Sequence, residues 1–128
     1  MKPPLEHIRL TEQAKDQLTK LKRATGIKNW NALCRWAFCL SLKDPSRPTP
    51  QEIKTDSSVE MTWRVFGGEE SDTLAGLFAL RCRADGIDPT DAHATASEFR
   101  LHLHRGIGVL ASARDILGIG TLINRLIV

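Results

Sequence analysis

The segment that most constrains the fold of this chain is the stretch 32–40, Ala-Leu-Cys-Arg-Trp-Ala-Phe-Cys-Leu, in which only Arg35 is polar. The residues around it predict a helix from about Asn29 to Lys43, with Asn29 or Asn31 as its N-cap. A helix that is apolar on almost every side must be buried from several directions. Because the chain has only 128 residues, this pattern indicates an oligomeric core as much as an internal one.

A short strand is predicted near the N-terminus, where residues 5–10 alternate roughly between apolar and polar side chains. Ile8 and Leu10 fall on one face of such a strand. His7 and Arg9 fall on the opposite face. This alternation is typical of a half-buried strand, with its basic side chains turned to solvent.

An amphipathic helix follows the strand. Thr11 can cap its N-terminus through the side-chain hydroxyl, and Gly26 is suited to end it. The mostly apolar stripe of this helix, at spacings of four and three residues, consists of Ala14, Leu18, Leu21 and Thr25. The basic residues that lie off the stripe are Lys15, Lys20, Lys22 and Arg23. We therefore expect one buried side and one basic side.

The middle of the chain predicts a loop and a second strand. Residues 44–58 contain three prolines and several Ser and Thr residues, which is typical of a linker or surface loop. Residues 61–66 are rich in large apolar and β-forming side chains, so a short strand is expected there. Gly67 and Gly68 would end it.

Two further helices are predicted after this strand. The first is expected from Ser71, its cap, to about Arg83. The second is expected to begin with Asp88 as its cap and Pro89 in its first turn, and to end at Gly106. The residues expected to face the core are Leu74, Leu77 and Phe78 in the first helix and Ala92, Ala96, Phe99 and Leu103 in the second.

These elements predict a single, mainly α domain over residues 1–128. It consists of a strand-helix-helix unit at residues 5–43, the loop at 44–58 and a helical part at 59–128. The tail after Gly106 is too apolar for a free end, and we expect one or two short helices there.

Composition narrows the class of protein. Hydrophobic residues make up 41% of the chain and charged residues 26%, which argues against disorder. No run approaches the ~18 apolar residues of a membrane span, and the first residues do not form a secretory signal. The three cysteines, Cys34, Cys39 and Cys82, lie in apolar runs and are expected to be buried thiols without a disulfide framework. We therefore expect a cytoplasmic protein with no membrane partner.

The formal net charge of +3 conceals an uneven distribution. Residues 1–55 carry eleven Lys and Arg against five Asp and Glu, a formal charge of +6, and they include every lysine. Residues 56–128 carry seven arginines against ten acidic residues, a formal charge of −3. A basic front indicates a surface for a polyanion, with nucleic acid as the first candidate. The alternative is an ordinary solvated surface.

The unit at residues 5–43 resembles the ribbon-helix-helix module of small prokaryotic DNA-binding proteins, whose strands pair between two chains and enter the major groove. The resemblance implies that His7 and Arg9 face base edges. It also implies that the N-terminus of the second helix meets phosphate, where free N–H groups favour an anion. The residues at this helix start are Lys28, Asn29, Trp30 and Asn31. The same pattern also fits an edge strand followed by an ordinary pair of helices.

Two blocks of sequence resemble the DndE family of DNA sulfur modification proteins. The first reads His7-Ile-Arg-Leu-Thr and continues to Asn31-Ala-Leu-Cys-Arg-Trp-Ala-Phe-Cys-Leu-Ser-Leu. The second reads Asp85-Gly-Ile-Asp-Pro-Thr-Asp-Ala-His and continues to Leu101-His-Leu-His-Arg-Gly-Ile-Gly-Val-Leu-Ala-Ser. The resemblance covers the chain from about Leu5 to its C-terminus.

This resemblance implies a non-catalytic accessory subunit of the bacterial Dnd phosphorothioation system, in a restriction-modification context. Other Dnd subunits, its implied partners, supply the cysteine desulfurase, the iron–sulfur protein and the ATPase. The resemblance further implies a homo-oligomer, a tetramer, that binds duplex DNA with a preference for nicked duplex. It offers no catalytic motif and no cofactor to carry over.

The predicted DNA-binding residues are Lys15, Lys20, Lys22, Arg23, Lys28, Arg9, His7 and Asn31. Two other functions fit the same sequence. A ribbon-helix-helix transcriptional repressor or antitoxin would need His7 and Arg9 on an exposed, paired ribbon. An assembly scaffold without direct DNA contact would instead use the apolar second helix and the tail.

No arrangement of residues indicates an enzyme or a metal site. Cys34 and Cys39 diverge by about 140° on a helix, so they cannot easily share a metal ion. Glu98 and His102, four residues apart, could lie together, but no third ligand is evident beside them. Arg35, alone in an apolar helix, is expected to be a buried ion pair or a helix-end partner, with phosphate binding as the alternative.

Overall fold

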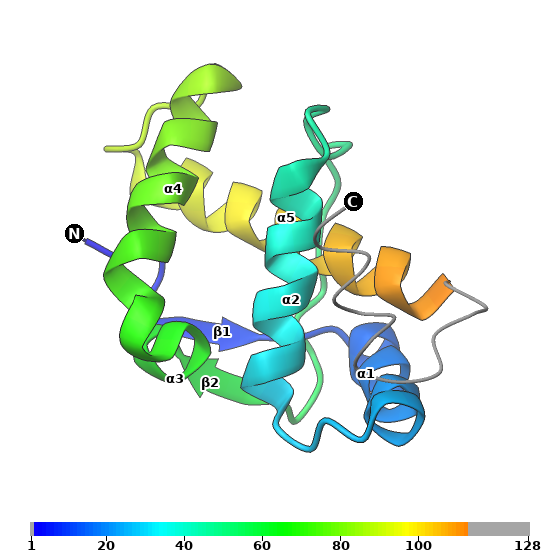
Figure 1. Cartoon of the computed structure of the whole chain (residues 1–128). Helices are drawn as coiled ribbons and strands as arrows, with labels where there is room; N and C mark the ends of the chain where they lie inside the picture. Colours follow the sequence, from blue (N-terminus) through cyan, green and yellow to red (C-terminus); the bar gives the residue numbers. More distant parts are fainter. Residues whose placement is uncertain (1, 113–128) are drawn as a thin grey trace.

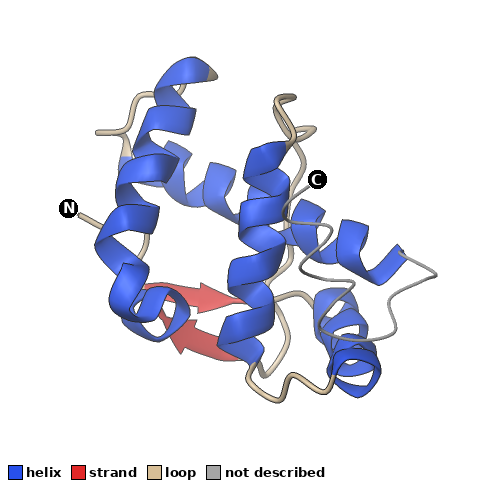
Figure 2. Ribbon diagram, in the orientation of Figure 1, coloured by secondary structure: helices blue, strands red, loops and turns tan. Residues whose placement is uncertain are grey.

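The computed structural model describes residues 2–112. Among these residues the fold is mainly helical, as predicted, with one small sheet (Figures 1 and 2). Helix α2 lies at the centre, α5 passes across it, and α1 and the sheet lie toward the same end of the molecule. The elements are β1 (His7–Arg9), α1 (Glu12–Thr25), α2 (Trp30–Lys43), β2 (Glu60–Thr62), α3 (Trp63–Gly67), a 3₁₀ turn (Gly68–Glu70), α4 (Ser71–Ala84) and α5 (Ala92–Ser112). None of these helices combines the length and the hydrophobicity that a membrane span requires.

Helix α1 has the ends and the buried stripe that its sequence predicts. The Thr11 hydroxyl accepts a hydrogen bond from the backbone N–H of Ala14 at 3.0 Å. Gly26 ends the helix in the left-handed region, at φ 76°, where a Cβ would be strained. The buried residues are Ala14, Leu18, Leu21 and Thr25.

Helix α2 was expected to be buried from several directions, but within the single chain only one broad face of it is buried. That face consists of Leu33, Cys34, Ala37, Phe38 and Ser41. Trp36 and Leu40 pack against the core from its margin and are only partly buried. The expectation of a buried thiol is wrong for Cys39, which is exposed, and is confirmed for Cys34 and Cys82.

The partner of β1 comes from the same chain. β1 and β2 pair antiparallel, with Ile8 opposite Met61 and Arg9 opposite Glu60. The predicted strand at residues 61–66 is wrong in most of its length, because the strand ends at Thr62. The Thr62 hydroxyl accepts from the backbone N–H of Val65 at 3.2 Å and so caps α3.

Helices α4 and α5 depart from prediction at their N-termini and on one face. The expectation that Ser71 caps α4 is wrong, because Ser71 is the first residue of the helix and Glu70 is its N-cap. Leu77 was expected in the core but is 49% exposed. Helix α5 begins three residues later than expected, because Asp91 and not Asp88 caps it, accepting from the N–H of Ala94 at 3.0 Å. Ala92, expected to be buried, is therefore exposed at the helix start.

Helix α5 also continues through Gly106, the residue expected to stop it, as far as Ser112. Gly106 is buried against α2, so this glycine serves close helix packing rather than termination. The short helices predicted in the tail fall mostly at residues 113–128, which lie outside the described part of the chain.

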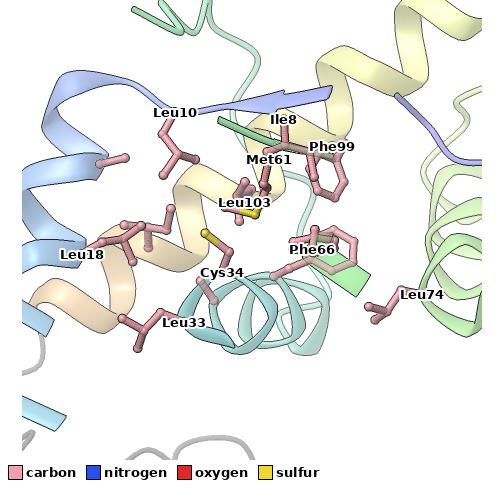
Figure 3. Packing of buried hydrophobic residues seen from close by; sticks show 14 of the residues in the cluster. Ile8, Leu10, Leu18, Leu33, Cys34, Met61, Phe66, Leu74, Phe99 and Leu103 are labelled. Carbon is pink, nitrogen blue, oxygen red and sulfur yellow. The ribbon is translucent and has the colours of Figure 1, made fainter. Parts of the chain in front are cut away.

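The core fills the space between α2, α5, the sheet and α3. Its centre is Phe38, whose ring lies 4.9 Å from Phe99 and 5.7 Å from both Phe66 and Phe78, measured between ring centroids. Figure 3 shows other side chains of this core, among them Ile8, Met61, Cys34, Phe66 and Leu103. The sheet is thus held on the same core as the two central helices.

Candidate nucleic-acid interface

The two basic side chains of β1 share one acidic neighbour. His7 and Arg9 are exposed, as predicted. Arg9 Nη2 lies 2.7 Å from Glu60 Oε2 on the paired strand, and His7 Nδ1 lies 3.9 Å from Glu60 Oε1. Glu60 offsets the positive charge of these two side chains. The surface of the sheet is therefore a weaker site for phosphate than the exposed side of α1.

Two lysines on one flank of α1 are held by neighbouring segments. Lys15 Nζ donates to Ser58 Oγ at 2.9 Å. Lys22 Nζ lies 4.2 Å from the centroid of the Trp30 ring, a cation–π contact that joins α1 to the start of α2. The two lysines are seven residues apart, so they follow each other along the helix at about 10 Å. Their ammonium groups are partly positioned before any ligand binds.

Three further basic side chains are exposed and form no ion pair within residues 2–112. Lys20 and Arg23 lie three residues apart on the outward side of α1, and Lys28 lies in the turn before α2. At 100° per residue, the four basic positions of α1 span roughly 160° of its circumference. We refer to Lys15, Lys20, Lys22, Arg23 and Lys28 as the α1–α2 basic surface.

The N-terminus of α2 adjoins this basic surface. Asn29 is its N-cap, but the Asn29 side chain makes no capping hydrogen bond, and no acidic residue lies in the first turn. These features favour an anion at the free N–H groups. Asn31 does not point its amide to this end, because Asn31 Nδ2 donates to the carbonyl of Val65 at 3.2 Å. The structure therefore brings five of the eight predicted residues together and places His7, Arg9 and Asn31 in other contacts.

Arg35 has the structural role that the sequence favoured. Its Nη1 donates to the carbonyl of Phe66 at 2.9 Å, at the end of α3. The thiol of the neighbouring Cys34 is unreactive, because burial raises its pKa to about 12 and so keeps it protonated. Neither residue is part of the exposed basic surface.

A histidine that sequence reasoning did not assign supports the start of α1. His104 Nδ1 donates to the carbonyl of Arg100 at 2.7 Å, so its Nε2 is the acceptor for the backbone N–H of Thr11 at 3.2 Å. Burial lowers the pKa of His104, which favours this neutral form. This bond fixes the N-cap of the basic helix to α5, and no local spacing could have indicated it.

A second polar cluster lies away from this surface, where the ends of α2 and α4 meet α5. Asp85, Glu98 and His102 each offer a potential metal-ligand atom, and these atoms lie within 4.8 Å of one another. Burial, followed by the nearby charges of Arg81 and Arg105, lowers the pKa of His102 to about 4, so its imidazole is neutral at pH 7. The sequence indicated the Glu98–His102 pair and missed Asp85, which comes from a different element.

Comparison with known proteins shows which family this chain resembles in sequence and in fold. The family model described as "DNA sulphur modification protein DndE" matches residues 7–117. The crystal structure of DndE from Escherichia coli B7A, involved in DNA phosphorothioation modification, is similar with a TM-score of 0.69 and 25% sequence identity. That match covers 83% of this chain and 96% of the other.

A second solved structure, a DndE mutant with two glycines replaced by lysine, matches with a TM-score of 0.65 and 22% identity. It covers 85% of this chain and 99% of the other. No curated protein sequence matches the chain. The family match extends from the first strand to beyond the last described helix, and the chain belongs to the DndE family of DNA sulphur modification proteins.

Proposed function

We propose that this chain is a non-catalytic, DNA-binding accessory subunit of the bacterial DNA phosphorothioation machinery. It acts in the cytoplasm beside the other Dnd subunits. The observation that carries the proposal is the α1–α2 basic surface on a member of a DNA sulphur modification family. On this surface Lys20, Arg23 and Lys28 are exposed and free of ion pairs within the described residues.

The proposed ligand is duplex DNA, bound through its phosphates. Side chains of α1 contact one stretch of backbone, and Lys28 with the open N-terminus of α2 receives a neighbouring phosphate. Lysine dominates this surface, and lysine neutralises phosphate as a point charge without the bidentate base contact that specifies sequence. We therefore expect little sequence preference.

A preference for nicked duplex is the finer part of the proposal. The basic positions span roughly 160° of the circumference of α1, and the nick preference follows if the duplex bends or splays to contact all of them. A broken strand lowers the energy of that deformation, whereas intact duplex resists it. Single-stranded DNA carries a lower charge density and should bind more weakly at equal salt.

A homotetramer is the proposed assembly. Leu77 and Leu80 on α4 are 49% and 64% exposed in the single chain, and Cys39 and the partly buried Trp36 lie on the outer side of α2. Large apolar side chains grouped on one helix favour self-association. Copies of the +3 chain would then present several basic surfaces to one DNA molecule.

The proposal is tested by measuring affinity for intact, nicked and single-stranded DNA of one sequence at salt concentrations from 50 to about 200 mM. We expect the dissociation constant to rise steeply with salt, with a slope that corresponds to several phosphates. Light scattering on the same samples gives the mass of the assembly. An affinity for duplex that hardly changes over this range contradicts phosphate binding.

A scaffold without DNA contact is the second candidate, favoured by the exposed leucines of α4. It predicts that a variant with Lys15, Lys20 and Lys22 all changed to Gln keeps full function in phosphorothioation. The DNA-binding proposal predicts that this variant loses function while its assembly mass is unchanged. A repressor is less favoured, because Glu60 engages the two strand residues that would read bases.

A further inference from the structure

One buried carboxylate oxygen in the chain has no hydrogen-bond partner among the described residues. It is Oε2 of Glu98, in a side chain that is only 4% exposed. Burying a polar atom without a partner costs several kcal/mol in an apolar surrounding. Such an atom in a folded protein therefore points to a missing ligand, a water or an ion.

The surroundings of this oxygen favour an ion. Glu98 and His102 lie one turn apart on α5, and Asp85 approaches them from the turn after α4. One potential ligand atom from each residue lies within 4.8 Å of the other two. Asp85 is 12% exposed at its side chain, so the cluster has an edge toward solvent by which an ion can enter.

We propose that Asp85, Glu98 and His102 form a binding site for a divalent transition-metal ion, with Zn²⁺ as the best match. Two carboxylate oxygens and one imidazole nitrogen form a borderline donor set that suits Zn²⁺ better than the all-oxygen sets preferred by Mg²⁺ and Ca²⁺. Three protein ligands leave a fourth position for water. The bound ion would give Oε2 of Glu98 the partner that it lacks.

Each of the three side chains has one polar atom engaged by a neighbour, which leaves the other for the ion. Arg47 Nη2 donates to Glu98 Oε1 at 2.9 Å. Arg81 Nε donates to Asp85 Oδ2 at 3.0 Å. The arrangement matches metal sites in general, where the ligands are oriented by hydrogen bonds from outer residues.

The histidine is oriented in the same way. His102 Nδ1 lies 2.8 Å from Ser41 Oγ, so Nε2 is the ring nitrogen that would meet the ion. Ser41 Oγ also accepts from Arg105 Nε at 2.9 Å. A serine oxygen has two lone pairs, so it can accept from Arg105 and from a protonated Nδ1 of His102 at once. That is the tautomer that coordination through Nε2 requires.

The distances between the ligand atoms need only small adjustments. Ligands at 2.0–2.2 Å from a tetrahedral zinc ion lie about 3.4 Å apart, so modest side-chain rotations would close the cluster around the ion. Arg47 and Arg81 balance the two carboxylates when no ion is bound. The ion would fasten the turn after α4 to α5, a structural role separate from DNA binding.

The test uses the full chain, treated with chelator and dialysed, and titrated with zinc chloride at neutral pH. Isothermal titration calorimetry should give one saturable ion per chain. The melting temperature should rise by about 5 °C or more when free zinc exceeds the dissociation constant a hundredfold. The same titration with magnesium chloride should show no comparable binding.

Two variants remove ligands and two serve as matched controls. Glu98→Gln and Asp85→Asn should each weaken zinc binding at least tenfold. Asp88→Asn changes an exposed carboxylate of the same turn, one that binds Thr90 instead. His93→Gln changes an exposed histidine of α5. Both controls should bind zinc as the original chain does.

Absence of saturable zinc binding to the original chain overturns the proposal. So does full retention of binding in both ligand variants, because the ion would then lie elsewhere. Loss of zinc binding in His93→Gln would also overturn the proposal, because the ion would then be bound at the surface, at the exposed His93. If circular dichroism shows that Glu98→Gln does not fold, Asp85→Asn decides, since its side chain lies at the edge of the cluster.

Discussion

Gly106 on α5 lies directly against the backbone carbonyl of Ala37 on α2. A Cβ placed on Gly106 would stand 1.8 Å from that carbonyl oxygen, far inside van der Waals contact. The oxygen belongs to a helical backbone, so it cannot move aside as a side chain would. The close contact between α5 and α2 at this point therefore depends on the absence of a side chain at Gly106.

Gly106→Ala should destabilise the protein by about 3 kcal/mol or more, because the two helices must separate. Gly108→Ala is the matched control, since a Cβ there meets nothing within 4 Å. Alanine should stabilise α5 at that position by about 0.5–1 kcal/mol. Urea unfolding followed by circular dichroism measures both. Equal effects of the two changes would contradict the helix contact.

Stability should fall as the pH drops from about 6.5 toward 4. The pKa of His102 is lowered to about 4 by burial and the nearby arginines, so the unfolded chain binds its proton first. The stabilisation from neutral His102 is complete above its unfolded pKa and is lost as pH falls toward the folded pKa. The loss amounts to about 3 kcal/mol.

The measurement is urea unfolding at a series of pH values in the presence of chelator. His102→Gln should be less stable at pH 7 and should show a flatter dependence over this window. His93→Gln, at an exposed position of the same helix, should follow the original curve. A steep acid dependence that survives in His102→Gln would assign the effect to another group.

Substitutions of Arg23 and Arg35 should have opposite effects: the first should change DNA affinity and the second should change stability. Arg23→Met on the exposed side of α1 should reduce the slope of log affinity against log salt by about 0.9, the value for one phosphate. It should leave stability unchanged within about 0.5 kcal/mol. Arg35→Met should lose about 1–3 kcal/mol of stability, because the Phe66 carbonyl loses its donor.

The salt slope of Arg35→Met, measured well below its melting temperature, should equal that of the original chain. The reverse pattern, with Arg35 controlling the slope and Arg23 the stability, would contradict the proposed interface. Lys54→Met, at an exposed position in the long loop, is a charge-matched control for the change at Arg23.

The exposed leucines of α4 should control the assembly. Changing Leu77 and Leu80 together to Gln should reduce the mass measured by light scattering, because both side chains are largely solvent-exposed in the single chain. Circular dichroism should be unchanged, since neither residue lies in the core. An unchanged mass would place the interface between copies elsewhere.

Local sequence was sufficient for α1 and for much of the proposed interface. Thr11 and Gly26 mark the ends of the helix by chemistry that acts within a few residues. The spacing of its apolar residues fixed which side would be buried, and that left the lysines outside. These features require no knowledge of distant contacts, so the sequence alone determined them.

Tertiary structure decided the features that depend on residues far apart in the chain. Residues after Thr62 have strand-forming side chains, but the cap at Thr62 and the core around Phe66 make them helical. Gly106 looked like a helix stop, and only the proximity of Ala37 shows why glycine is needed inside α5. Asp85 joins Glu98 and His102 only because α4 and α5 meet. Spacing along one helix reports its own face, whereas a site shared by several elements exists only when packing brings them together.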